Sequence, residues 1–184
     1  MRYFKKIMNE TIKYDLEAIT KKKYSFPYLC YCIIKNRGFR YVFYLRMAGK
    51  KGTFKPLFIL LHSKLSHKMN NEISYKTKIG KGFTLGHPSS IVINPDAELG
   101  EDVSVSHGVT IGMVKSGKRQ GVPKLNNHIY IGANASIVGG VTIGNDVLIA
   151  ANSFVDFDVP DNSLVLGNPG IIKHKENACT KDYH

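Results

Sequence analysis

The fold is decided by residues 131–156, which read Ile131-Gly-Ala-Asn-Ala-Ser-Ile137-Val-Gly-Gly-Val-Thr-Ile143-Gly-Asn-Asp-Val-Leu-Ile149-Ala-Ala-Asn-Ser-Phe-Val155-Asp156. An aliphatic residue returns at every sixth position. A period of six fits neither the α-helical period of about 3.6 nor a hairpin meander with turn signals about every 8–12 residues. It fits a coiled sheet in which each unit of six forms one short strand and one corner, with the aliphatic side chain pointing inward. The stretch therefore predicts a β-solenoid.

The same spacing extends toward the N-terminus with two interruptions. The earlier aliphatic positions are Ile73, Ile79, Leu85, Ile93, Leu99, Val105, Ile111 and Leu125. A two-residue slip follows Leu85, and a basic insertion from Met113 to Lys124 follows Ile111. Chance spacing in an ordinary β protein does not explain 13 positions in one series. Since three sides of six make a coil of about 18 residues, residues that far apart should share a face, one layer of about 4.8 Å apart.

The chain before the repeat has a different hydrophobic periodicity. Helical spacing is visible in Phe39, Val42, Phe43 and Arg46, and again in Leu57, Leu60, Leu61, Lys64, Leu65 and Lys68. Gly52 suits a break between two helices, and Pro56 suits the first turn of the second. We predict a helical domain over residues 1–71, the solenoid over 72–172 and a tail over 173–184.

Charge divides the chain in the same place. Residues 1–70 hold 16 Lys and Arg against 3 Asp and Glu, whereas residues 71–184 hold 10 against 11. The basic half predicts an anionic partner, such as a membrane surface. A helical cap and oligomerisation domain with ordinary surface lysines explains the same charges, as does a non-enzymatic basic binding module. No nucleic-acid motif is present, so we expect no nucleic-acid partner.

Composition also bears on the compartment. The longest apolar run, from Pro56 to Leu61, is far shorter than the roughly 20 residues of a membrane span, and no secretory signal is visible. Cys30, Cys32 and Cys179 have no disulfide or metal-ligand spacing, which is typical of reduced thiols. We expect a cytoplasmic protein, with the inner face of the membrane as its contact surface.

The segment from Ile73 to Ile172 resembles the hexapeptide-repeat acyltransferases. The resemblance is carried by Gly82-Phe-Thr-Leu-Gly-His-Pro-Ser-Ser-Ile-Val-Ile-Asn94, Val103-Ser-Val-Ser-His-Gly-Val-Thr-Ile-Gly112 and Gly167-Asn-Pro-Gly170. Within that family the chain is similar to serine acetyltransferases and to capsular and exopolysaccharide O-acetyltransferases. The resemblance implies a mainly β protein built on a left-handed parallel β-helix, a handedness that general chirality rules would not favour. It also implies acetyl-CoA as acetyl donor and a homotrimer with active sites between neighbouring prisms.

The two-residue slip contains the candidate catalytic base. His87, in Gly86-His87-Pro88-Ser89-Ser90, occupies the position of the family's catalytic histidine. Imidazole, with a reference pKa of about 6.5, suits the removal of a proton from an acceptor hydroxyl. His107 follows after one coil plus the slip, so it should stack beside His87. It resembles the His-Gly-Val-Thr histidine of the polysaccharide enzymes and is predicted to assist or to bind the acceptor, a structural turn residue being the alternative.

The resemblance suggests further site residues. Serine-type enzymes carry an aspartate one coil before the histidine, and counting back places Glu72 there as the orienting carboxylate. They also carry a histidine before the Pro-Lys pair of the insertion, where this chain has Val122, which argues against serine as substrate. The insertion's Lys115, Lys118, Arg119 and Lys124 are candidates for the phosphates of acetyl-CoA, against a plain solvated loop.

Family members offer backbone groups to the pantetheine arm at matching corners. Those positions are Ala133 and Ala151 and, less tightly, Gly112, Asn168 and Pro169, with simple corner packing as the alternative. No metal is expected. A zinc hydratase of the same solenoid class would need His87, His107 and His128 to converge on one ion.

We therefore expect an acetyl-CoA-dependent O-acetyltransferase that acts on a hydroxyl, with a sugar of a capsular or exopolysaccharide precursor as acceptor. L-serine, as in cysteine biosynthesis, is the alternative acceptor.

Overall fold

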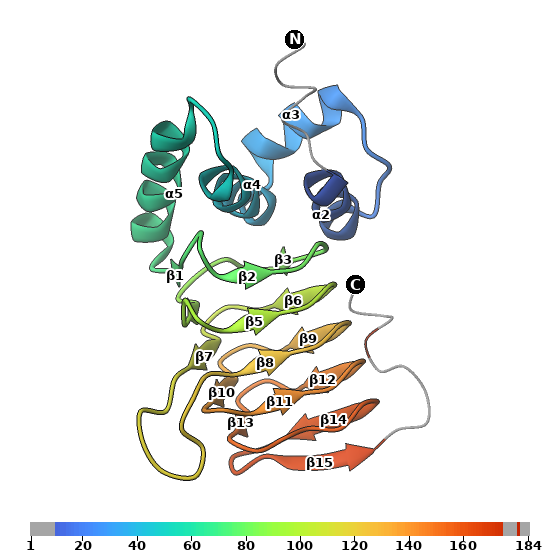
Figure 1. Ribbon diagram of the computed structural model, residues 1–184. Coiled ribbons are helices and arrows are strands. Elements are labelled where there is room, and N and C mark those ends of the chain that lie inside the picture. The colour runs from blue at the N-terminus through green and yellow to red at the C-terminus, as the bar shows by residue number, and fades with distance from the viewer. Residues whose placement is uncertain (1–9, 175–179, 181–184) are drawn as a thin grey trace.

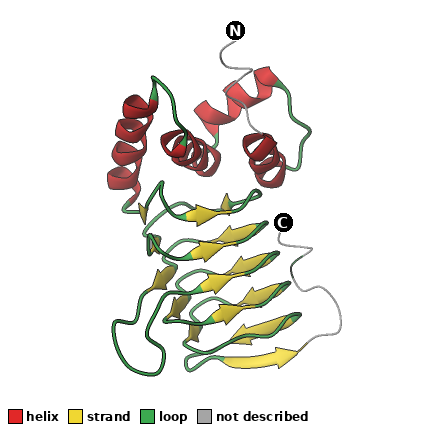
Figure 2. Cartoon of the chain, viewed as in Figure 1, coloured by secondary structure: helices red, strands yellow, loops and turns green. Residues whose placement is uncertain are grey.

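The computed structural model describes residues 10–174 and residue 180. Within these residues, helices stand at one end of a triangular prism of strands (Figures 1 and 2). The helices are α2 (Glu10–Thr20), α3 (Phe26–Lys35), α4 (Arg37–Gly49) and α5 (Lys55–Met69). The break predicted at Gly52 lies between α4 and α5, and Pro56 lies in the first turn of α5, as the sequence indicates.

The prism is a left-handed β-helix with three faces. The first face consists of β1 (Glu72–Ile73), β4 (Val92–Ile93), β7 (Thr110–Gly112), β10 (Ser136–Val138) and β13 (Phe154–Val155). The second face consists of β2 (Lys78–Ile79), β5 (Glu98–Leu99), β8 (Lys124–Leu125) and β11 (Thr142–Ile143). The third face consists of β3 (Thr84–Leu85), β6 (Val103–Val105), β9 (Ile129–Ile131), β12 (Val147–Ile149), β14 (Ser163–Leu166) and β15 (Ile171–His174).

Strand register confirms the coil length and both interruptions. On the first face, Val92 pairs with Thr110 and Ser136 pairs with Phe154, and each pair is separated by one regular coil of three six-residue sides. Glu72 pairs with Val92, one coil plus the slip further along the chain. Thr110 pairs with Ser136, one coil plus the insertion further along. The extra residues therefore leave the faces as loops and do not shift the strands.

The repeated aliphatic side chains form one buried column, as the period predicts. Twelve of the thirteen are buried, namely Ile73, Leu85, Ile93, Leu99, Val105, Ile111, Leu125, Ile131, Ile137, Ile143, Ile149 and Val155. Ile79 is partly buried against the same cluster. The column continues into the helices, because Tyr41, Val42 and Leu45 of α4 belong to it. The helices thus close the first end of a core that a β-helix would otherwise expose to water.

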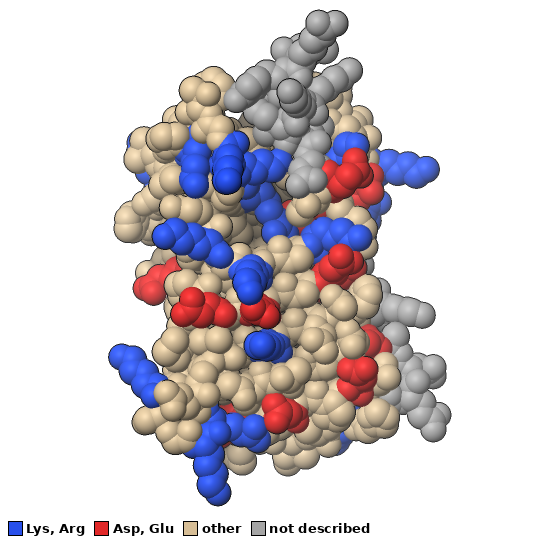
Figure 3. Space-filling view, viewed as in Figure 1, with Lys and Arg blue, Asp and Glu red and all other residues tan. Residues whose placement is uncertain are grey.

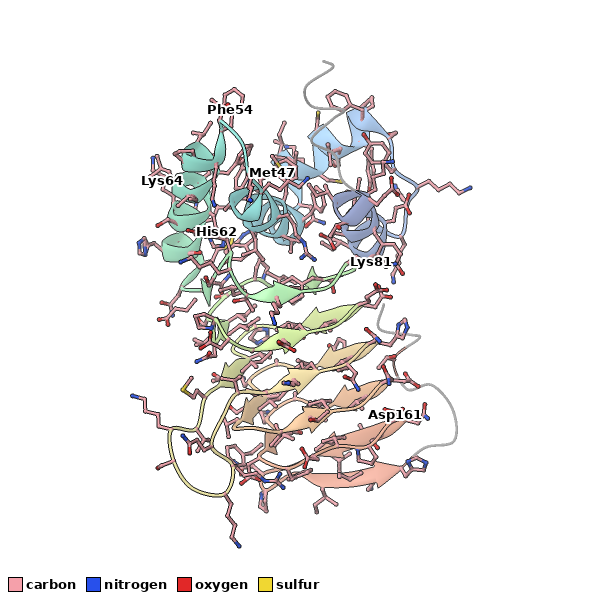
Figure 4. The ribbon with its side chains drawn as sticks, viewed as in Figure 1. Met47, Phe54, His62, Lys64, Lys81 and Asp161 are labelled. Atoms are coloured by element: carbon pink, nitrogen blue, oxygen red, sulfur yellow. The ribbon has the colours of Figure 1, made fainter. Side chains whose placement is uncertain are left out.

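A buried polar contact fastens α2 and α4 to the first coil. The Arg46 guanidinium donates to both carboxylate oxygens of Asp15 and to the carbonyls of Ile79 and Gly80. Asp15 also accepts from the amides of Gly82 and Phe83, at 2.7 and 3.2 Å, and is 1% exposed. Burial raises the pKa of the Asp15 carboxyl, and Arg46 opposes that shift. Lys81 lies over the Tyr14 ring beside this contact (Figure 4).

The far end closes in a way that the repeat does not predict. β15 pairs antiparallel with β14 and forms the outer strand of the third face. The coil before it is shorter than a regular coil, since Leu148 pairs with Leu164. Most of the predicted tail, including Cys179, lies outside the described residues, although β15 extends to His174.

The charged side chains are distributed unevenly over the helices, the insertion loop and the prism. Lys and Arg side chains gather over the helices and the insertion loop on the face shown in Figure 3, and acidic side chains are scattered between them. Among the described residues, no helix combines the length and apolar character that a membrane span requires.

Candidate active site

A cleft of about 860 Å³ lies between the helices and the first edge of the prism. Its helical wall is the junction of α3 and α4, and its other wall is the edge at which the chain passes from the third face to the first. The lining residues are Lys35, Asn36, Arg37, Gly38, Gly86, His87, Pro88, Ser89, Ser90, His107, Gly108 and Asn134. None of them carries a large apolar side chain. Such a lining suits a polar, hydroxyl-rich ligand.

The structure brings His87 and His107 together in this cleft. Their ring centroids are 6.1 Å apart and the rings stand edge to face at 74°. Both residues are exposed. The proximity predicted from their spacing in the sequence is therefore confirmed, whereas the catalytic roles of the two residues stay predictions.

The two-residue slip forms the loop that presents His87. The amide of Gly86 still bonds to Val105 of the next coil, at 3.3 Å, so the strand is regular up to that point. The chain then turns back on itself, with the Ser89 amide donating to the His87 carbonyl at 2.8 Å. Ser90 has a φ of 56°, a conformation that returns the chain to the first face. Because the slip lies outside the strands, His87 is free to face the cleft.

The helical wall is held against this loop by a glycine. A Cβ added to Gly38 would lie well inside 3.0 Å of the Leu85 carbonyl oxygen, a distance that real Cβ atoms essentially never reach. Only glycine lets α4 approach so closely. The Asn36 side chain caps α4 by accepting from the Phe39 amide at 2.9 Å. Lys35 and Arg37 flank the cap and line the cleft.

Within one chain Glu72 does not line the cleft with His87, and its role as the orienting carboxylate stays a prediction. It is exposed at the start of β1, on the rim of a second hollow of about 740 Å³ between α5 and the first face. The residues next to the His87 loop in the preceding turn are asparagines. Asn71 accepts from the Ile91 amide at 3.0 Å, and Asn70 donates to the Ser90 hydroxyl at 3.5 Å. None of the described residues that line the cleft is an Asp or a Glu.

The predicted cofactor corners continue the histidine edge away from the helices. The Asn134 amide donates to the His107 carbonyl at 2.9 Å, and the Asn152 amide donates to Ala133 at 2.8 Å. The order along the edge is therefore His87, His107, Ala133 and Ala151, one coil apart. Asn168 and Pro169 follow, exposed, on the next turn, where Gly167 accepts from the Phe154 amide at 3.0 Å. The small side chains leave the backbone of this edge open to an extended ligand.

Gly112, Lys124 and the insertion lie elsewhere on this chain. Gly112 ends β7, at the opposite end of that strand from the histidine edge, and Lys124 is exposed on the second face. The insertion loop folds back through a bridge between Val114 and Gly121 and extends beside the lower coils (Figure 1). Arg119 forms an ion pair with Asp158 at 3.1 Å, while Lys115 and Lys118 are exposed. Within one chain these cations do not reach the histidine pair.

His128 lies on a different edge, where the chain passes from the second face to the third, 3.4 Å from Asp102. The three histidines considered for a zinc site therefore do not converge within one chain.

Lys35, Asn36 and Arg37 are cleft residues that the sequence did not single out. Periodicity describes each element and not how the helices dock on the prism. The sequence feature that could have indicated this docking is Gly38, a glycine in the basic first turn of an amphipathic helix.

The comparisons with known proteins fit this geometry. Residues 123–156 match the family described as bacterial transferase hexapeptide (six repeats). A putative colanic acid biosynthesis acetyltransferase of Escherichia coli is 36% identical over 118 residues, which cover 64% of this chain and 72% of the relative. The chain belongs to the hexapeptide-repeat transferase family.

This chain is also similar to serine acetyltransferases. The solved structure of the Neisseria gonorrhoeae serine acetyltransferase superposes with a TM-score of 0.75 at 30% identity, covering 94% of this chain and 67% of that one. Serine acetyltransferase 2 of Arabidopsis thaliana is 33% identical over 88% of this chain and 51% of the relative. The chain thus spans about half the length of the plant enzymes that it matches.

Proposed function

We propose that this protein transfers the acetyl group of acetyl-CoA to a hydroxyl of a sugar, within a precursor of a capsular or extracellular polysaccharide. The observation that carries the proposal is the pair of exposed imidazoles, 6.1 Å apart, in a cleft lined by polar groups. Membership of a transferase family whose similar members include acetyltransferases supports the reaction type.

The chemistry needs a base beside an acceptor hydroxyl. His87 takes the hydroxyl proton while the hydroxyl oxygen attacks the carbonyl carbon of the thioester. The new C–O bond forms, the C–S bond breaks, and the sulfur leaves with the bonding electron pair. The imidazolium of His87 returns the proton to that sulfur, which gives CoA with a free thiol. His107 holds the acceptor beside His87 during these steps.

Acetyl-CoA is the second substrate, and the open corner edge fits its extended arm. With Ala133 and Ala151 on this edge, the pantetheine arm lies along the coils below the histidines and brings its thioester to His107 and His87. The insertion lysines act on the phosphates from a neighbouring subunit of the trimer that the family resemblance implies, since within one chain they lie away from the edge.

A sugar acceptor is supported by the character of the cleft. Its volume lies in the range of sites that hold drug-sized ligands, and serine needs little of it. His107 lies in the cleft, and the insertion has Val122 where serine-type enzymes carry a histidine. L-serine is the competing acceptor because several similar proteins are serine acetyltransferases.

The test is release of free thiol from acetyl-CoA with L-serine and a panel of monosaccharides offered in parallel. We expect turnover with sugars above that with serine. Replacement His87→Ala should lower turnover by about 100-fold or more, the usual contribution of a positioned base. His128→Ala is the matched control, because it removes an exposed imidazole from another edge and should leave turnover unchanged.

Three outcomes contradict the proposal. Wild-type turnover in a folded His87→Ala variant would refute the base assignment. Thiol release with serine alone would refute the sugar acceptor. Absence of thiol release with every acceptor would refute acetyl transfer itself.

A further inference from the structure

We infer that the acceptor carries an anionic group, a carboxylate or a phosphate, which Lys35 and Arg37 bind on the helical wall of the cleft. The inference rests on the proposed acetyl transfer and specifies the chemical class of its acceptor.

The first argument is the charge balance of the cleft. Its lining combines the Lys35 ammonium and the Arg37 guanidinium with two imidazoles and with no described carboxylate. Cationic groups without anionic neighbours in a concave site attract an anion, because the low-dielectric walls concentrate their field. The proposed chemistry needs one imidazole as a base and does not need two additional cations.

The second argument is the difference in ion pairing between these two cations and others near the junction, as far as the described residues show. Neither Lys35 nor Arg37 forms an ion pair with a residue in 10–174 or with residue 180. In contrast, Arg46 pairs with Asp15 at 2.9 Å, and Lys81 pairs with Glu101 at 3.3 Å. Both cleft cations are exposed and can therefore meet a ligand without breaking an internal contact.

The third argument is the position of the cations relative to the base. Gly38, the neighbour of Arg37, touches the Leu85 carbonyl, and only Gly86 separates Leu85 from His87. The contact fixes the helical wall relative to the base. A ligand anchored by Arg37 therefore presents its hydroxyls to His87 from a defined side, which suits a guanidinium that binds carboxylate or phosphate through two parallel hydrogen bonds.

Acetyl-CoA also carries phosphates, but the order of residues along the edge argues against these cations as their partners. The sequence of positions is helical wall, His87, His107, Ala133 and Ala151. The donor's arm is proposed to lie along the alanines, on the far side of the histidines from the helices. The acceptor then occupies the helical side, beside Lys35 and Arg37.

The experiment compares acceptors that differ in one group. Galactose, galacturonic acid and galactose 6-phosphate share their ring hydroxyls and differ at one carbon. We expect kcat/KM to be about tenfold or more higher for an anionic member than for galactose, since a hydrogen bond to a charged group contributes at that scale. The two anionic arms tell a carboxylate site from a phosphate site.

The variant Lys35→Gln/Arg37→Gln removes both cations and should abolish this preference by lowering kcat/KM for the anionic sugars, while the KM for acetyl-CoA stays within about twofold of the parent value. The single variant Arg37→Lys keeps Lys35 and the charge at position 37 but loses the bidentate geometry, so it should retain part of the preference. The matched control is Lys64→Gln/Lys68→Gln, which removes two exposed cations from α5; Lys64 points away from the other helices (Figure 4).

Equal use of galactose and its anionic relatives would overturn the inference. An increase in the KM for acetyl-CoA in the Lys35→Gln/Arg37→Gln variant, with acceptor preference unchanged, would overturn it as well. If no acceptor releases thiol, the proposed function fails, and saturation-transfer NMR then decides the inference separately. Binding of galacturonic acid or galactose 6-phosphate above galactose, lost in the same double variant, supports it, and equal binding refutes it.

Discussion

The contact between Gly38 and Leu85 makes a sharp test, because it joins the two walls of the cleft. An added methyl group in Gly38→Ala would overlap the Leu85 carbonyl oxygen, which is backbone and cannot rotate away. The helix must therefore retreat from the edge by roughly 1 Å to restore van der Waals contact. Leu85 precedes the loop that carries His87, so the retreat changes the distance between the helical wall and the base.

A displacement of about 1 Å at a reacting centre can lower turnover by about 100-fold, because the reacting atoms lose their alignment. We expect a loss of this order for Gly38→Ala in the thiol-release assay, mostly in kcat/KM for the acceptor. Most of the buried column lies away from the contact between Gly38 and Leu85, so the β-helix should stay folded. Circular dichroism and thermal unfolding would verify this.

Gly49→Ala is the matched control at the other end of α4. A Cβ there would lie 3.2 Å from the Tyr75 carbonyl oxygen, an overlap that a shift of a few tenths of an ångström relieves. Its turnover should stay within about threefold of the parent protein. Near-normal turnover in Gly38→Ala, or an equal loss in Gly49→Ala, would refute the argument that this contact sets the width of the cleft.

Two further predictions concern the helices. Asp15→Ala leaves the Arg46 guanidinium and the amides of Gly82 and Phe83 without their carboxylate partner, so we expect the free energy of unfolding in urea to fall by about 3–5 kcal/mol. Glu10→Ala, at an exposed site, is the control and should cost less than about 0.5 kcal/mol. Similar values for the two variants would contradict a stabilising role of the buried Asp15–Arg46 contact. Leu57 and Leu60 are 49% and 52% exposed on α5, which also carries the exposed Lys64 and Lys68. The protein should therefore sediment with anionic but not zwitterionic vesicles, and Leu57→Glu/Leu60→Glu should lower the bound fraction several-fold. Equal sedimentation with both kinds of vesicle would exclude an electrostatic membrane contact.

The six-residue period predicted the prism closely because strand, corner and inward side chain recur together in every unit. A slip or insertion in such a repeat must leave the faces, since the hydrogen bonds between coils fix the register of what remains. The distance between His87 and His107 could therefore be anticipated by counting residues.

Counting was less informative where the repeat meets the helices. Glu72 was predicted one coil before His87, but α5 runs to Met69 and leaves only Asn70 and Asn71 to turn into the first strand. The asparagine side chains bond to the His87 loop and its exit, and Glu72 opens onto another hollow. The helical wall was missed for a related reason, because docking of α4 depends on tertiary contacts that no local period encodes.

The six-residue period did not predict the closing strand, β15, either. β15 turns back antiparallel to β14 and covers that edge, which a solenoid of parallel coils would leave unpaired. In this strand, Ile171 to His174, Ile172 is partly buried against the core column and Ile171 is exposed, so the strand does not continue the six-residue spacing.

The two interruptions of the repeat have different consequences for specificity. The longer insertion is anchored to its own chain by Arg119 and Asp158 and extends away from the histidine edge, so it is suited to meet a neighbouring subunit. The short slip can reach only the helices of the same chain, where Gly38, Arg37 and Lys35 lie across the cleft from it. In the proposed function, the prism edge and the insertion therefore bind the acetyl donor. We propose that the acceptor is selected by the helical wall, where Lys35 and Arg37 are exposed and can be replaced without removing a side chain from the buried column.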